Sequence, residues 1–169
     1  MHDVDLLDRF RRALAGSGWI IELTQARTIV PAPLAHVDEA LRRFVATTGS
    51  CESADGAIWF MGADDYERDD GEGWNFLQKQ ISEPSADGAP KWLDEITRFW
   101  GEHVPFAISA RGDYGYLAVN RSGAVVCGYA PELEDARVVA ESYSAFIERI
   151  VEECRNRSGD FYDAWIRQL

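Results

Sequence analysis

The chain of 169 residues has 29 acidic and 17 basic side chains, which gives a formal net charge of −12. Hydrophobic residues make up 46% of it, a globular rather than a disordered composition, and its length suits a single domain over residues 1–169. An acidic chain repels polyanions, which argues against nucleic acid as a partner. No apolar run is long enough to cross a membrane, and the acidic N-terminal residues lack the features of a secretory signal, so we expect neither membrane binding nor export.

The negative charge is concentrated in the middle of the chain. Residues 51–102 hold 13 acidic and 4 basic side chains, a net charge of −9, against 0 for residues 1–50 and −3 for residues 103–169. A field of this sign attracts cationic molecules and speeds their association. The charge therefore favours a cationic protein partner.

The first half of the chain alternates between helical and extended patterns. Apolar residues recur at helical spacing in two places, and the first of these runs stops at Gly16-Ser17-Gly18, as a helix C-terminus does. In chain order we expect a helix over residues 6–14, short strands over 19–23 and 28–30, a helix over 37–45 ending at Gly49, a strand over 57–61, a short helix over 74–81 and a loop over 84–89.

The second half contains three apolar runs separated by turn residues. Arg111-Gly112-Asp113 and Asn120-Arg121-Ser122-Gly123 interrupt these runs, because glycine and Asp or Asn favour turns. We expect a helix that begins at Pro90 with Trp92, Ile96 and Phe99 on one face, and then strands over 106–109, 116–119 and 124–129. Residues 132–135 then lead into a long helix closed by residues 158–160, and residues 161–169 predict a short final helix.

The strands cluster in adjacent hairpins and do not alternate with helices. This arrangement predicts an α+β fold with a single sheet, mostly antiparallel or mixed, flanked by helices. We expect the sheet to be built from about residues 57–61 and 105–129.

An acidic segment stands out between these elements. Residues 64–73 contain a single arginine and six carboxylates: Asp64, Asp65, Glu67, Asp69, Asp70 and Glu72. A calcium loop with Gly71 at its sixth position would need a glutamate at its twelfth, where the chain has Leu77. Two interpretations remain: a solvated loop kept polar by its charge, or a partner-binding loop in which Tyr66 and Trp74 serve as anchors.

Residues capable of catalysis or cofactor binding form no recognisable pattern. His2, His36 and His103 lack the spacing of zinc ligands, and no nucleophile elbow, phosphate loop or dinucleotide fingerprint is present. We therefore expect no enzyme activity, metal or cofactor. The three cysteines, Cys51, Cys127 and Cys154, are an odd number without the spacing of metal ligands. Cys127 lies in a strand pattern and Cys154 on an apolar helix face, so we expect buried free thiols and a reducing cytoplasm.

Residues 90–152 resemble the SUKH superfamily, the Smi/Knr-like proteins. The motif elements that carry the resemblance are Pro105-Phe106, Gly112-Asp113, Leu117, Gly123 with Val125, and Ser142-Tyr143 with Phe146-Ile147. The resemblance implies an α+β sheet with flanking helices and no cofactor. For many members it also implies inhibition, by direct binding, of a bacterial toxin encoded beside them.

Charge and resemblance together predict a non-catalytic immunity protein in the cytoplasm that binds a cationic toxin domain, such as a nuclease. The candidate partner-binding residues are Asp64, Asp65, Tyr66, Glu67, Asp69, Asp70, Glu72 and Trp74. The alternative function is that of a regulatory or scaffold protein that binds an endogenous partner.

Overall fold

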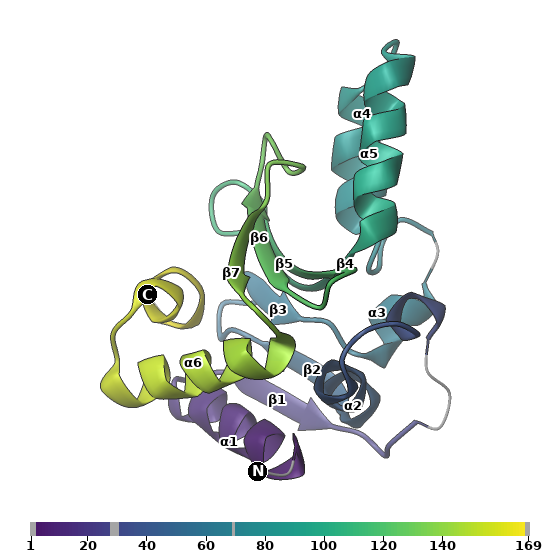
Figure 1. Cartoon of the computed structure of the whole chain (residues 1–169). Coiled ribbons are helices and arrows are strands. Elements are labelled where there is room, and N and C mark those ends of the chain that lie inside the picture. The colour runs from purple at the N-terminus through teal and green to yellow at the C-terminus, as the bar shows by residue number, and fades with distance from the viewer. Residues whose placement is uncertain (1–2, 28–30, 69, 168–169) are drawn as a thin grey trace.

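A seven-stranded antiparallel sheet runs through the described residues of the computed structural model, which are 3–27, 31–68 and 70–167 (Figure 1). The strands follow one another across the sheet in chain order. They are β1 Ile20–Leu23, β2 Thr48–Glu52, β3 Ile58–Phe60, β4 His103–Ser109, β5 Gly115–Asn120, β6 Val125–Tyr129 and β7 Arg137–Ala140.

The α+β fold and its antiparallel sheet are confirmed, and the sheet is wider than predicted. The strand predicted at 28–30 lies outside the described residues. Two strands were not predicted. β2 begins where the second helix was expected to end, and its sequence Thr-Gly-Ser-Cys-Glu has too little apolar character to indicate a strand. β7 lies at an edge of the sheet and has only four residues, Arg-Val-Val-Ala, which show no alternation of apolar and polar side chains.

One face of the sheet is covered by α1 Asp3–Gly16, α2 Glu39–Thr47 and α6 Tyr143–Asn156 (Figure 1). Phe60 of β3 lies at the centre of this layer, with ring centroids 5.5 Å from Phe10 of α1 and 6.0 Å from Phe44 of α2. Phe106 of β4 continues the cluster to Phe146 of α6, at 5.7 Å. The aromatic rings therefore join three helices to the two central strands.

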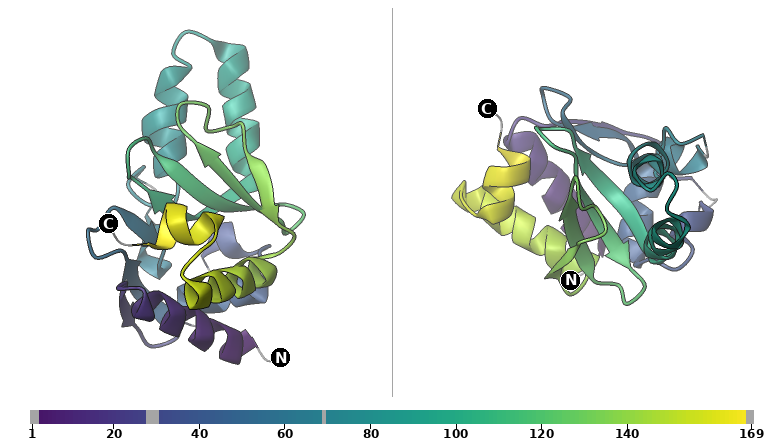
Figure 2. Two further views of the ribbon diagram at one scale, coloured as in Figure 1. Left: turned by 90° about the vertical axis from the view of Figure 1, so that its left-hand side faces the viewer. Right: turned by 90° about the horizontal axis from the view of Figure 1, so that it is seen from above.

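The other face of the sheet carries a helical hairpin that projects from the body (Figure 2). It consists of the π-helical segment η2 Leu77–Ser82, the single turn α4 Glu83–Ser85, where a loop was expected, and α5 Pro90–Glu102. The ring of Trp100 lies 5.1 Å from that of Tyr116 on β5, and its indole N–H donates to Ser82. The predicted inward face of α5 is wrong at Trp92, which is 44% exposed because the hairpin extends beyond the sheet.

The C-terminal part differs from its prediction at both ends. The long helix does not follow residues 132–135 directly, because β7 intervenes, and α6 begins after Ser142, whose hydroxyl accepts from the Ala145 N–H at 3.1 Å. The final helix is the short π-helical η3, Tyr162–Ile166, and residues 168–169 of its prediction lie outside the described residues. All three cysteines are buried free thiols, as predicted.

A substitution at Leu117 tests the central position of β5 in the sheet. Its side chain is fully buried, so Leu117→Asp places an unpaired charge in the core and should lower the free energy of unfolding by more than about 3 kcal/mol. Val138→Asp is the matched control, because Val138 is 64% exposed on the same sheet and should change stability little. Urea unfolding measures both. Equal losses for the two variants would contradict the placement of Leu117 in the core.

Candidate functional site

The acidic segment begins as a short helix and not as the expected loop. α3, Ala63–Glu67, starts directly after β3, and its first turn is fixed by the Asp65 carboxylate, which accepts from the Gly62 backbone N–H at 2.8 Å. Asp65 is therefore a capping residue, which satisfies a backbone donor that the helix itself leaves free. Burial, the main effect, raises the pKa of Asp65 above its ordinary value.

Tyr66 is not the exposed anchor that the sequence suggested. It is 4% exposed, and its hydroxyl donates to the Pro105 carbonyl at 2.7 Å, so it ties α3 to β4. Burial raises the pKa of the Tyr66 phenol well above its usual range. Tyr66 thus holds the acidic segment in place and is unavailable to a partner.

Four other carboxylates of the segment face solvent, and three of them have a basic neighbour. Arg27 bonds both Asp64 and Glu67, and its pKa is raised by those contacts, first of all by that with Glu67. Arg68 lies 3.0 Å from Asp70 and holds the pKa of that carboxyl below its ordinary value. We define the acidic surface as the four exposed side chains Asp64, Glu67, Asp70 and Glu72. Asp69 lies outside the described residues.

The turn after α3 folds back tightly onto the helix. The Trp74 N–H donates to the Asp65 carbonyl at 3.0 Å. A Cβ atom at Gly73 would lie 2.2 Å from the same carbonyl oxygen, so only glycine permits this approach. The chain therefore places Trp74 beside the acidic surface in a defined position.

Trp74 lines a groove of about 600 Å³ whose walls are mainly apolar. The groove is formed by residues from the hairpin, from the ends of β4 and β5, and from the segment before α2. We call it the Trp74 groove, and its apolar lining includes Pro33, Val37, Trp74, Trp100, Val104 and Val119, with His36, Glu102 and Arg121 among its polar residues. None of the four carboxylates of the acidic surface lines this groove, but Trp74, which does, follows Glu72 by two residues in the chain.

Glu72 and Gly73 of the same turn line a second, smaller pocket of about 260 Å³. Its aromatic members include Phe76 and Tyr114, whose rings are 5.4 Å apart in an edge-to-face arrangement. Residues 72–74 therefore contribute to two hollows with aromatic lining, which is a typical composition for a protein-binding surface.

Sequence reasoning located the acidic segment and Trp74 but missed the groove. Its lining comes from four separate parts of the chain, and no local pattern joins Pro33 to Trp100 or Val119. The useful signal was the tryptophan at residue 74, directly after a dense run of charges. Asp64, Glu67, Asp70 and Glu72 are exposed, as both a solvated loop and a partner-binding loop require, whereas Asp65 and Tyr66 have structural roles.

Within the described ranges, no group of three or more His, Cys, Asp or Glu side chains is arranged to hold a metal ion. Across those same ranges, no helix combines the length and the apolar character needed to cross a membrane.

The capping role of Asp65 can be tested with two substitutions. Asp65→Asn keeps an oxygen that accepts from Gly62 and removes a half-buried charge, so stability should be equal or higher. Asp65→Ala removes the acceptor and should cost about 1 kcal/mol. Thermal unfolding of both variants provides the measurement. If alanine proved as stable as asparagine, Asp65 would not be the cap.

The same carboxyl predicts a pH dependence. Because the folded chain raises the pKa of Asp65 above 3.8, folded chains hold this proton more tightly than unfolded ones. Ionisation of Asp65 then costs stability as the pH rises through the folded pKa. The advantage of Asp65→Asn over the unmodified chain should therefore grow from acidic to neutral pH. A difference in unfolding free energy that stayed constant would contradict a raised pKa.

No family model matches the chain, and neither a curated protein nor a solved structure matches it.

Proposed function

We propose that this chain is a non-catalytic immunity protein of the cytoplasm, which neutralises a cationic bacterial toxin domain by direct protein–protein binding. The observation that carries the proposal is the position of Trp74, which lines an apolar groove and directly follows the turn that carries the acidic surface. An apolar centre next to a charged rim is the usual anatomy of a protein interface. The resemblance of residues 90–152 to the SUKH superfamily supports the toxin as the class of partner.

The charges of the acidic surface are better suited to speeding the association of a partner than to slowing its dissociation. They are exposed, and three of the four already have an arginine partner within the chain, so each isolated pair would add little to affinity. Their summed field still attracts a cationic surface, such as the phosphate-binding site of a nuclease. The apolar side chains of the groove, which lose contact with water on binding, would then supply the residence time.

The protein encoded by the neighbouring gene is the direct probe of this function. Its expression alone should arrest bacterial growth, and co-expression of this chain should restore growth and yield a complex that co-purifies. A neighbour that is harmless, or one that stays toxic in the presence of this chain, would overturn the immunity function. The first of these outcomes would favour a regulatory or scaffold protein.

Removal of four charges from the acidic surface should slow association with that toxin about tenfold at low salt, because steering depends on the local field. The difference should shrink at high salt, where charges are screened. The substituted positions are Asp64→Asn, Glu67→Gln, Asp70→Asn and Glu72→Gln. Stopped-flow kinetics at two ionic strengths provides the measurement.

The matched control removes the same number of charges from exposed positions elsewhere. It consists of Glu132→Gln, Asp135→Asn, Glu141→Gln and Glu148→Gln. If both sets slow association equally, only net charge matters and the acidic surface does not face the partner.

Trp74→Ala tests the groove. Loss of a half-buried aromatic anchor should speed dissociation about tenfold or more and leave the association rate nearly unchanged. Trp92→Ala removes another tryptophan, exposed on α5 and absent from the groove lining, and should leave both rates unchanged. Equal effects of the two substitutions would place the interface outside the groove.

A further inference from the structure

β7 forms one edge of the sheet, at the opposite end of the strand order from β1. This strand pairs with β6 on one side, and it is the last strand in the sheet order of the described residues. An edge strand carries a row of backbone N–H and C=O groups that can pair with an added strand. Val138 of β7 is also 64% exposed, so an apolar side chain of this edge strand faces solvent.

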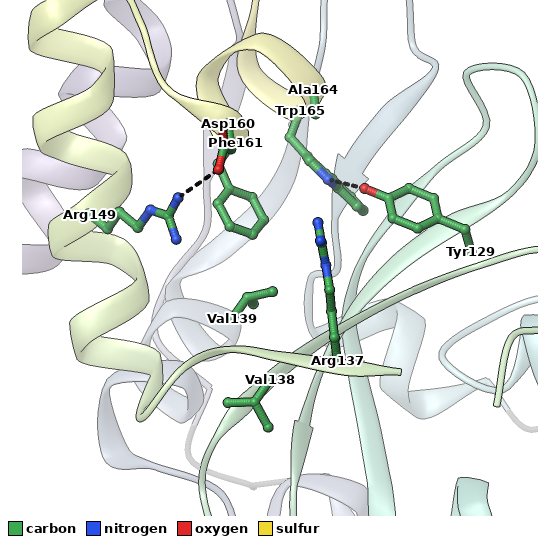
Figure 3. A pocket seen from close by; sticks show the side chains of 9 residues that line it. All are labelled: Tyr129, Arg137, Val138, Val139, Arg149, Asp160, Phe161, Ala164 and Trp165. Carbon is green, nitrogen blue, oxygen red and sulfur yellow. Dashed lines mark hydrogen bonds and ion pairs between the residues drawn. The ribbon is translucent and has the colours of Figure 1, made fainter. Parts of the chain in front are cut away.

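A pocket of about 240 Å³ opens beside this edge, between β7, α6 and η3 (Figure 3). Phe161 and Trp165 form its aromatic side, and the Trp165 indole N–H donates to the Tyr129 hydroxyl at 3.2 Å. From β7, the side chain of Arg137 extends toward Trp165, and Val139 lies on the same side (Figure 3). The pocket is therefore framed by the edge strand itself.

Two arginines line this pocket, and among the described residues only one of them, Arg149, has an ion-pair partner. Arg149 of α6 lies 2.7 Å from Glu153 and 3.7 Å from Asp160, so its charge is matched by carboxylates within the chain. Arg137 forms no ion pair with any residue that the structure describes. The one carboxylate among the described residues of the pocket lining, Asp160, lies near Arg149, so the exposed guanidinium of Arg137 keeps its hydrogen-bond donors for a carboxylate that enters the pocket.

The walls of the pocket are held in place independently of any ligand. The second oxygen of Glu153 accepts from the backbone N–H groups of Phe161 and Tyr162, at 2.9 and 2.8 Å. The guanidinium of Arg149 also lies over the Phe161 ring, 4.9 Å from its centroid. These contacts fix the start of η3 over the core and keep the pocket open toward β7.

We propose that β7 binds an extended peptide segment as an eighth strand, and that an acidic side chain of this segment enters the pocket and pairs with Arg137. Side chains alternate between the two faces of a strand, so every second residue of the added strand would point toward α6 and η3. Backbone pairing would supply affinity, and the pocket would select the residue type. A charge-assisted bond from a guanidinium favours a carboxylate over a neutral or basic side chain.

This edge is separate from the surface of the proposed function. The acidic surface and the Trp74 groove are built on the segments around residues 31–37, 62–74 and 100–121, and none of these residues lines the β7 pocket. The proposal therefore stands or falls independently of the toxin.

The test is an NMR titration of the full chain with short blocked peptides of alternating threonine and valine. One peptide has a central glutamate and its counterpart has a central lysine. The glutamate peptide should shift the backbone amide signals of residues 137–140 and the indole signal of Trp165, and should bind about tenfold more tightly than the lysine peptide. N-methylation of alternate peptide bonds, which removes backbone donors, should abolish binding.

Arg137→Gln should remove the preference for glutamate and leave binding of the lysine peptide unchanged or improved. Arg121→Gln is the control, since Arg121 lies at the Trp74 groove, and it should preserve the preference. Arg149 is unsuitable for this test because its loss would disturb Glu153 and η3.

Three outcomes would overturn the proposal. Equal affinity for both peptides would show that Arg137 does not select an acid. Shifts confined to other strands, or no binding of either peptide, would show that β7 does not accept an added strand. Concentration-dependent dimerisation with shifts at β7 would identify a second copy of the chain as the occupant.

Discussion

The fold depends on the burial of both faces of β4 and β5. On β5, Tyr116 faces the helical hairpin and contacts Trp100, whereas its neighbour Leu117 lies on the opposite face. Leu117 is in line with Cys127 of β6 and, across β4, with Phe60 of β3. Because consecutive residues of a strand point to opposite sides, a shift of one residue in register would exchange these two environments. On the hairpin side, the Tyr116 hydroxyl donates to the Leu133 carbonyl, and a side chain moved to the other face would lose this acceptor. This requirement specifies the register of the central strands and so positions everything attached to them.

The central strands and the helices with strong periodicity could be predicted from sequence, since β4 to β6 are nearly continuous apolar runs and α1 and α6 have regular apolar spacing. The two missed strands have a different physical origin. β2 is held by its neighbours on both sides and needs little apolar character of its own, while β7 is short and half exposed. Their existence follows from pairing with distant segments, which local patterns do not encode.

The candidate site, too, could be predicted only in part from the sequence. A dense run of carboxylates is visible in sequence, but the division of labour among them is not. Asp65 and Asp64 are adjacent and chemically identical, yet one caps a helix and the other pairs with Arg27 in solvent. The difference arises because α3 turns one side toward β4, and the Tyr66 contact with Pro105 determines which side that is. The Trp74 groove and the β7 pocket are further examples, since each joins residues from several elements.

The order of the strands makes the long segment between β3 and β4 an insertion between two neighbouring strands. These two strands are direct neighbours in the sheet, so the chain leaves at Phe60 and returns at His103 to pair beside its point of departure. In topological terms, α3, the acidic turn and the helical hairpin form an insertion in a simple meander. Insertions whose ends lie close together tolerate changes in length and sequence, because the closure entropy grows slowly with loop length. Most of the excess negative charge belongs to this insertion, as does Trp74, which follows the acidic turn and lines the groove. Recognition properties can therefore diverge here while the meander and its aromatic core keep their register.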